Sequence, residues 1–250
     1  MTKIKPDTEL QVENEENQSS SSTILDQIDS FNKLINSFIA AYNKYNQINE
    51  QIVLEYQNDE NIYQETSSGT SDQKKTQRSA LFDKFMQVFD DILLEILKIK
   101  RDSFYLFIHI FQLSNLNIIK FYECINKLLN VECKSGSNPK CQSIILHKSL
   151  EVLHVLTTNQ GKEYEDDEST VMCCEQLAHS FNFTGSLCSI LIVNSVNKYI
   201  NPMKKSRHAV LDENDYKITF DILNKLTRDN PLFNFDDNIK QFINYLVDKV

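Results

Sequence analysis

The sequence predicts an all-α protein in which a long N-terminal heptad helix forms a helical hairpin or coiled coil and is followed by a bundle of shorter helices. Apolar residues recur at alternating steps of three and four from Ile24 to Tyr63, a spacing that keeps one seam of a helix facing partner helices. The same spacing returns from Phe82 to Ile99. No segment shows the period-two alternation of a strand, and no internal repeat is visible.

The first 22 residues are predicted to be a disordered, acidic and Ser-rich tail. They are rich in Glu, Asn, Gln and Ser, so they offer little apolar surface to offset the entropy of ordering. Thr23 and Asp26 then resemble a capping box, which marks the start of a helix. We therefore expect the disordered tail over residues 1–22 and the long heptad helix over residues 23–65.

The heptad helix is predicted to bind partner helices. Both flanks of its seam carry apolar residues, such as Leu34 and Ile39, whereas a two-stranded coiled coil usually has charged flanks. A stripe of this width favours packing against two neighbours in a bundle. The alternative is that the stripe packs entirely within this chain. The residues expected to contact partners are Ile28, Phe31, Ile35, Phe38, Tyr42, Tyr45, Asn49 and Ile52.

Residues 66–77 are predicted to be a flexible linker, because TSSGTSDQKKTQ is small and polar throughout. A helical bundle domain is expected over residues 78–250, and its first helix folds back on the heptad helix. The helices are expected at about 79–131, either unbroken or bent near 114–117, and at about 141–156, 169–181, 185–200, 212–228 and 236–250.

Composition argues against several functional classes. The net charge is −9, so nucleic acid is disfavoured as the main partner. The four glycines at 69, 136, 161 and 185 are far apart, which excludes the Gly-rich phosphate loops of nucleotide-binding proteins. No catalytic motif is present. We therefore expect no cofactor and no enzymatic activity.

The expected location is intracellular, either cytoplasmic or nuclear. The chain begins with a polar, acidic segment rather than a signal peptide, so its six cysteines are expected to be reduced thiols. The apolar runs 104–111 and 187–193 are too short to span a bilayer. Lys204, Lys205 and Arg207 fit the short basic pattern of a nuclear import signal, and this pattern favours nuclear transcription machinery.

One group of residues suggests a metal site. His147, Glu151 and His154 share a helical face, and Glu151 with His154 forms the Glu-x-x-His step of carboxylate-bridged di-iron bundles. Such bundles need a second step of this kind and two further glutamates, and the sequence contains no second step. These three residues are therefore weak metal candidates, since histidines at a helix surface or hydrogen-bonded within a core explain the pattern better.

The functional prediction is a non-catalytic helical subunit or adaptor of an intracellular multiprotein complex, with other proteins bound through helix packing. The alternative is a metal-binding or enzymatic helical bundle centred on His147, Glu151 and His154. A third hypothesis, a peripheral membrane protein that inserts its last helix, is disfavoured because the polar face of that helix carries Asp236, Asp237 and Asp248.

Overall fold

The computed structural model describes residues 9–59, 68–130, 139–158, 168–195 and 211–228. These residues form α-helices and one π-helix, without a strand in any of the described ranges, so the all-α class is confirmed. The elements in chain order are α1 (Glu9–Asp59), α2 (Ser68–Asp102), α3 (Phe104–Phe111), α4 (Leu116–Leu129), α5 (Pro139–Thr157), α6 (Glu168–Glu175), the π-helix η1 (Gln176–Ser180), α7 (Phe183–Ser195) and α8 (Glu213–Thr227).

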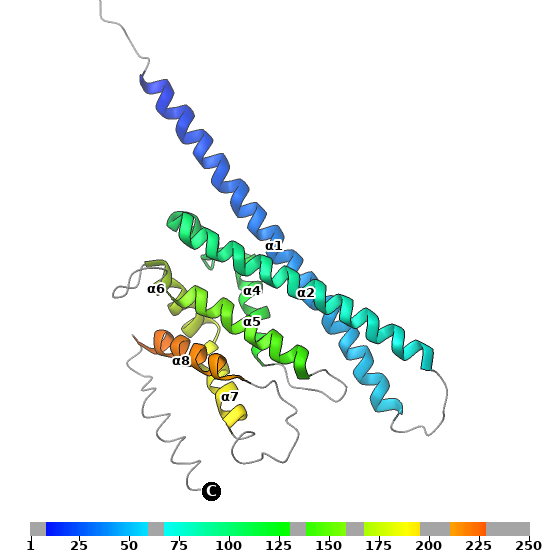
Figure 1. The fold of residues 1–250 in the computed structure, drawn as a ribbon. Coiled ribbons are helices and arrows are strands. Elements are labelled where there is room, and N and C mark those ends of the chain that lie inside the picture. The colour runs from blue at the N-terminus through cyan, green and yellow to red at the C-terminus, as the bar shows by residue number, and fades with distance from the viewer. Residues whose placement is uncertain (1–8, 60–67, 131–138, 159–167, 196–210, 229–250) are drawn as a thin grey trace, which may run out of the picture.

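The two longest helices pack side by side along their lengths. Helix α2 runs back antiparallel on α1 (Figure 1). Tyr45 contacts Phe82 and Phe38 contacts Phe89, so residues earlier in α1 meet residues later in α2. The apolar faces that the three-and-four spacing indicated are therefore turned toward each other. That the pair follows coiled-coil geometry stays a prediction.

Polar side chains divide the expected long helix over 79–131 into three parts. Ser103 ends α2 and caps α3, because its Oγ accepts a hydrogen bond from the backbone N–H of Leu106 at 3.3 Å. Asn115 caps α4 by accepting from the N–H of Asn117 at 3.1 Å. Of the two alternatives, an unbroken helix is wrong, because the helix is interrupted between Phe111 and Leu116. The break at Ser103 was not expected.

The helices form successive layers on the α1–α2 pair. Helices α4 and α5 lie in the middle, where α4 packs on α1 and α5 packs on α2. Helices α7 and α8 cover the far side, and α8 packs mainly on α5 (Figure 1). Phe38 occupies the centre of the first layer, since its ring lies 4.8 Å from that of Phe89 and 5.6 Å from that of Phe121 on α4.

Two helices of the N-terminal half begin earlier than the sequence indicated. Helix α1 begins at Glu9, so residues 9–22 are helical where a disordered tail was expected. Extension of an existing helix adds one hydrogen bond per residue without a new nucleation step. Helix α2 begins at Ser68 rather than near Ser79. Residues 68–77 are therefore helical where a linker was expected, at the start of a helix that packs on α1.

The later helices lie close to their expected positions. Helix α5 extends the expected helix 141–156 by two residues at its start and one at its end. The helix expected at 169–181 is divided into α6 and η1, and Asn182 follows in the left-handed region at φ 53°. Asn tolerates this conformation better than most residues. The helix expected at 236–250 falls outside the described residues.

Candidate functional site

The residues expected to bind partner helices face the interior of this chain. Phe31, Ile35, Phe38, Tyr45 and Ile52 are buried. Ile28 and Tyr42 are half-buried against the same core. Helices α2, α3 and α4 cover this face. Within the described residues these side chains therefore pack as the alternative of internal packing expected, and their binding to another protein stays a prediction.

Asn49 is the polar member of that seam. Its Oδ1 is buried and makes no hydrogen bond within the part of the chain that the structure describes. An unsatisfied buried acceptor costs about 1–3 kcal/mol. In helix assemblies, an asparagine in the seam fixes the register of the packed helices at such a cost. Because the seam of α1 packs within this chain, Asn49 would fix the register of α1 against the neighbouring helices of its own bundle.

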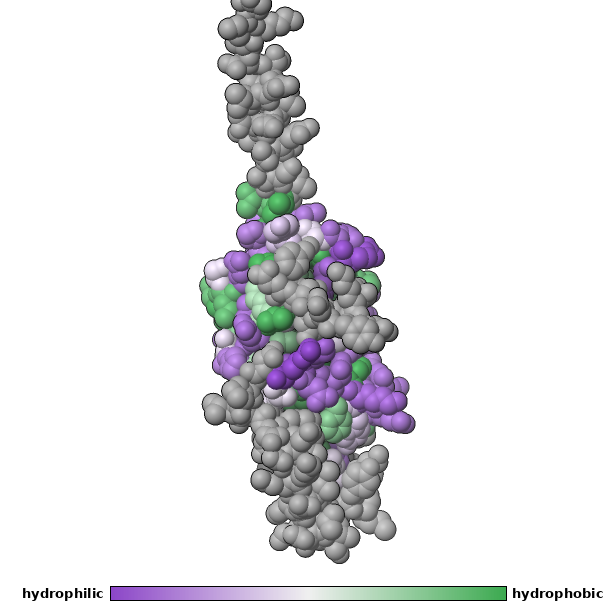
Figure 2. Space-filling model, turned by 90° about the vertical axis from the view of Figure 1, so that its left-hand side faces the viewer, coloured by the Kyte–Doolittle hydropathy of each residue, from purple (hydrophilic) through white to green (hydrophobic). Residues whose placement is uncertain are grey.

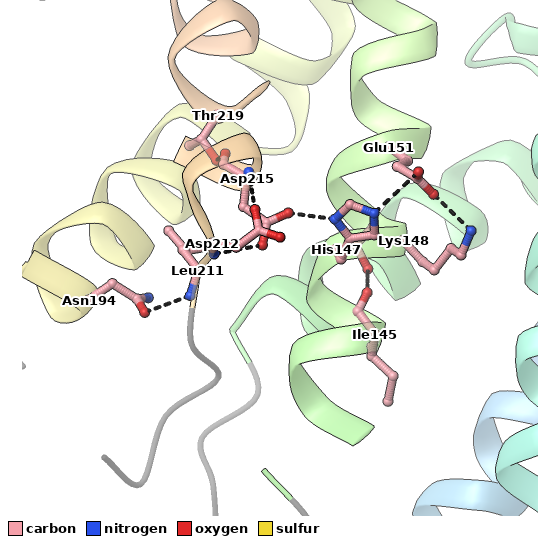
Figure 3. A network of polar contacts seen from close by, with 10 residues as sticks. Ile145, His147, Lys148, Glu151, Asn194, Leu211, Asp212, Asp215 and Thr219 are labelled. Carbon is pink, nitrogen blue, oxygen red and sulfur yellow. Dashed lines mark hydrogen bonds and ion pairs between the residues drawn. The ribbon is translucent and has the colours of Figure 1, made fainter. Parts of the chain in front are cut away.

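The main polar cluster of the described residues joins α5 to α8 (Figure 3). His147 on α5 places Nδ1 2.6 Å from Oδ1 of Asp215 on α8, and its Nε2 lies 3.3 Å from Oε1 of Glu151. Lys148 joins the cluster to α2, with Nζ 2.9 Å from Oε2 of Glu151 and 3.0 Å from Oδ1 of Asp90. Three helices are thus tied together around one imidazole.

The start of α8 is built to hold two carboxylates beside that imidazole. Asp212 is the N-cap residue, and its Oδ1 accepts a hydrogen bond from the N–H of Asp215 at 2.8 Å. In return, Asp215 Oδ2 accepts from the N–H of Asp212 at 3.1 Å. This reciprocal capping box fixes both side chains. Asp215 is 3% exposed, so its charge needs a partner such as His147.

The surroundings of His147 favour a positive charge. Burial alone would lower the pKa of His147, but the hydrogen bond to Asp215 and the negative charges of Asp215, Glu151 and Asp212 outweigh burial and raise it. Burial likewise opposes ionisation of Lys148, and the carboxylates of Glu151 and Asp90 raise the pKa of Lys148 above its ordinary value.

The metal triad expected from the sequence is not assembled. His154 points to a different acid, since its Nε2 lies 2.9 Å from Oδ2 of Asp221 on α8. Glu151 lies beside Nε2 of His147 and Lys148 rather than beside His154. In the described ranges, a different set of side chains brings its potential metal-ligand atoms together. These are His147, Asp212 and Asp215, whose atoms lie within 4.8 Å of one another.

A second polar cluster holds the end of α5. Lys100 on α2 donates to the carbonyl oxygens of Val155 at 2.9 Å, Leu156 at 3.3 Å and Thr158 at 2.8 Å, and to Oγ1 of Thr170 on α6 at 3.1 Å. The last carbonyls of a helix lack partners within it and carry partial negative charge. Lys100 therefore acts as a C-terminal cap supplied by another helix.

Three thiols of the described residues are poorly suited to nucleophilic chemistry. Burial raises the pKa of Cys124 to about 12 and raises the pKa values of Cys141 and Cys188 as well. Since the thiolate is the reactive form, a raised pKa lowers the reactive fraction at neutral pH.

Sequence reasoning missed the acidic residues of the α5–α8 contact. The pattern Asp212-x-x-Asp215 ahead of an amphipathic helix was a usable signal for the capping box. Nothing in the sequence predicts that Asp215 contacts His147 or that Asp221 contacts His154, because the members of each pair are more than 60 residues apart. The suggested import residues Lys204, Lys205 and Arg207 fall outside the described residues.

Comparison of the chain with models of known families, with curated proteins and with solved structures finds no match. Among the described helices, none combines the length and the apolar character that crossing a bilayer requires.

Proposed function

We propose that this chain is a non-catalytic helical subunit or adaptor that binds a partner protein through the N-terminal part of α1. The observation that carries the proposal is the length of α1. Its 51 residues span about 76 Å, whereas the 35 residues of α2 span about 52 Å. The start of α1 consequently extends beyond the end of α2 and beyond the bundle (Figure 1).

The surface where α1 leaves the bundle supports this use. Leu25 is 63% exposed there, beside the half-buried Ile24 and Ile28, and Figure 2 shows hydrophobic surface at this point. An uncovered helix in water is only marginally stable, so a partner helix that pairs with the extension would stabilise it. Residues 9–23 include four glutamates and no lysine or arginine, which favours a basic partner surface.

The test is a deletion of residues 9–23 in the full chain. The tagged wild-type chain and the deletion variant are each used to capture proteins from their native cells. Candidates are then purified and assayed for direct binding. We expect a stoichiometric protein that binds the wild-type chain and not the deletion variant, although both unfold at the same temperature. Replacing Glu13, Glu15 and Glu16 by Gln should weaken binding and its dependence on salt.

Equal binding by the two chains would refute the proposed docking segment. Recovery of the bare chain alone would refute the adaptor function. A photo-crosslinking residue at position 16 provides an independent check, because its adduct should form with the captured protein and not with α2 to α8.

A further inference from the structure

We propose that His147, Asp212 and Asp215 form a binding site for a divalent transition-metal ion of the zinc type. The three side chains come from two helices, and their potential ligand atoms lie within 4.8 Å of one another. Ligand atoms bound to Zn²⁺ at about 2.0–2.2 Å in tetrahedral arrangement lie about 3.4 Å apart. An ion between them therefore requires the 2.6 Å contact of His147 Nδ1 with Asp215 Oδ1 to lengthen to about 3.4 Å. This inference is independent of the adaptor function.

The capping box leaves the required oxygen atoms in place. It uses Oδ1 of Asp212 and Oδ2 of Asp215 to accept backbone N–H groups. Oδ1 of Asp215 faces His147, and the second oxygen of Asp212, an exposed residue, takes no part in the capping box. Both carboxylates can thus remain helix caps while each offers one atom to an ion. The backbone bonds hold them before any ion arrives, which limits the entropy lost on binding.

The contact on the other side of His147 fits metal ligation. A ligating histidine generally donates its second ring N–H to a carboxylate, which fixes the ring and its tautomer. Here Nδ1 faces the two aspartates and Nε2 lies 3.3 Å from Oε1 of Glu151. Lys148 holds that carboxylate in turn through Oε2 at 2.9 Å. Glu151 lies outside the three proposed ligands, so this arrangement is a separate observation from their proximity.

The carboxylates around the cluster also favour a bound cation. Four carboxylates gather there, from Asp90, Glu151, Asp212 and Asp215, and in the contacts described Lys148 is the permanent cation that faces them. The positive end of the α8 dipole opposes a metal ion, but the two carboxylates that cap it offset this effect. One imidazole with two carboxylates suits zinc, cobalt or manganese better than calcium, and three protein ligands leave a position for water.

The test is a titration of the full chain with Co²⁺, followed by visible absorption. We expect saturation at one ion per chain without the sulfur-to-cobalt charge-transfer band that thiolate ligands give. Asp212→Asn should reduce the affinity at least tenfold while preserving the fold, since Asn caps helices as well as Asp. Glu151→Gln should weaken binding about 10–100-fold.

The matched control is His154→Ala. His154 lies on the same helix and also contacts an aspartate of α8, so this variant loosens the same helix contact while all three ligands remain. Its affinity for Co²⁺ should equal that of the wild-type chain. Three outcomes would overturn the proposal: no saturable uptake, a thiolate band that Asp212→Asn leaves unchanged, or equal losses in Asp212→Asn and His154→Ala.

Discussion

Truncation of Phe38 tests whether the apolar seam of α1 is the core of this chain. Phe38 is 0% exposed, and its ring lies 4.8 Å from Phe89, 5.3 Å from Phe85 and 5.6 Å from Phe121. A buried Phe→Ala change costs about 3–5 kcal/mol in total, and the loss of three aromatic contacts places Phe38 toward the upper end of that range. We therefore expect Phe38→Ala to lower the free energy of unfolding by about 4–5 kcal/mol.

The measurement is urea denaturation of the full chain followed by circular dichroism. The matched control is Leu94→Ala on α2, because Leu94 is 64% exposed and exposed substitutions usually change stability by no more than about 0.5 kcal/mol. A loss near 4–5 kcal/mol is a large part of the about 5–15 kcal/mol typical of a domain. If Phe38→Ala loses less than about 1 kcal/mol and abolishes partner binding, the seam faces another protein and the structural reasoning fails.

Three further outcomes are expected from the same denaturation assay. Lys100→Met should lose about 2–3 kcal/mol, because three carbonyl oxygens at the end of α5 lose a charged donor; an unchanged midpoint would contradict this role. Asn49→Leu should gain about 1 kcal/mol by removing a buried, unsatisfied oxygen, and a loss of stability would show that Asn49 has a partner. Burial raises the pKa of Tyr45 from 10.0 to about 12, so its contribution is complete below pH 10.0 and is lost as the pH rises toward 12. Tyr45→Phe should reduce that alkaline loss, and equal alkaline loss in both chains would argue against it.

The fold class could be predicted because the apolar periodicity of α1 and α2 reflects burial directly. Composition was misleading at residues 68–77, where Gly69 and several Ser, Thr and Lys residues are typical of a linker. Local propensity differs between helix and coil by fractions of a kcal/mol per residue, and packing against a neighbouring long helix outweighs it. The register of two packed helices depends on both helices. The periodicity of one segment alone therefore does not predict which residues of α1 lie beside residues 68–77.

One part of the candidate site, the proximity of His147 and Glu151, could be predicted from the sequence. His147 and Glu151 were identified because they share one face of one helix, and that short-range relation holds in the structure. The other two proposed ligands, Asp212 and Asp215, lie at the start of α8. Only the packing of α5 on α8 brings Asp215 to His147. His154 was grouped with the wrong residues for the same reason. Periodicity reports which side of a helix is buried, but it does not identify the helix that covers it.

The cap that Lys100 supplies to α5 has a consequence for folding kinetics. Its hydrogen bonds connect residues 55 to 70 positions apart, so they form only after a long loop has closed. Contacts that form after the transition state govern the unfolding rate rather than the folding rate. Lys100 would then leave the folding rate nearly unchanged and lower the unfolding rate, which lengthens the lifetime of the folded chain.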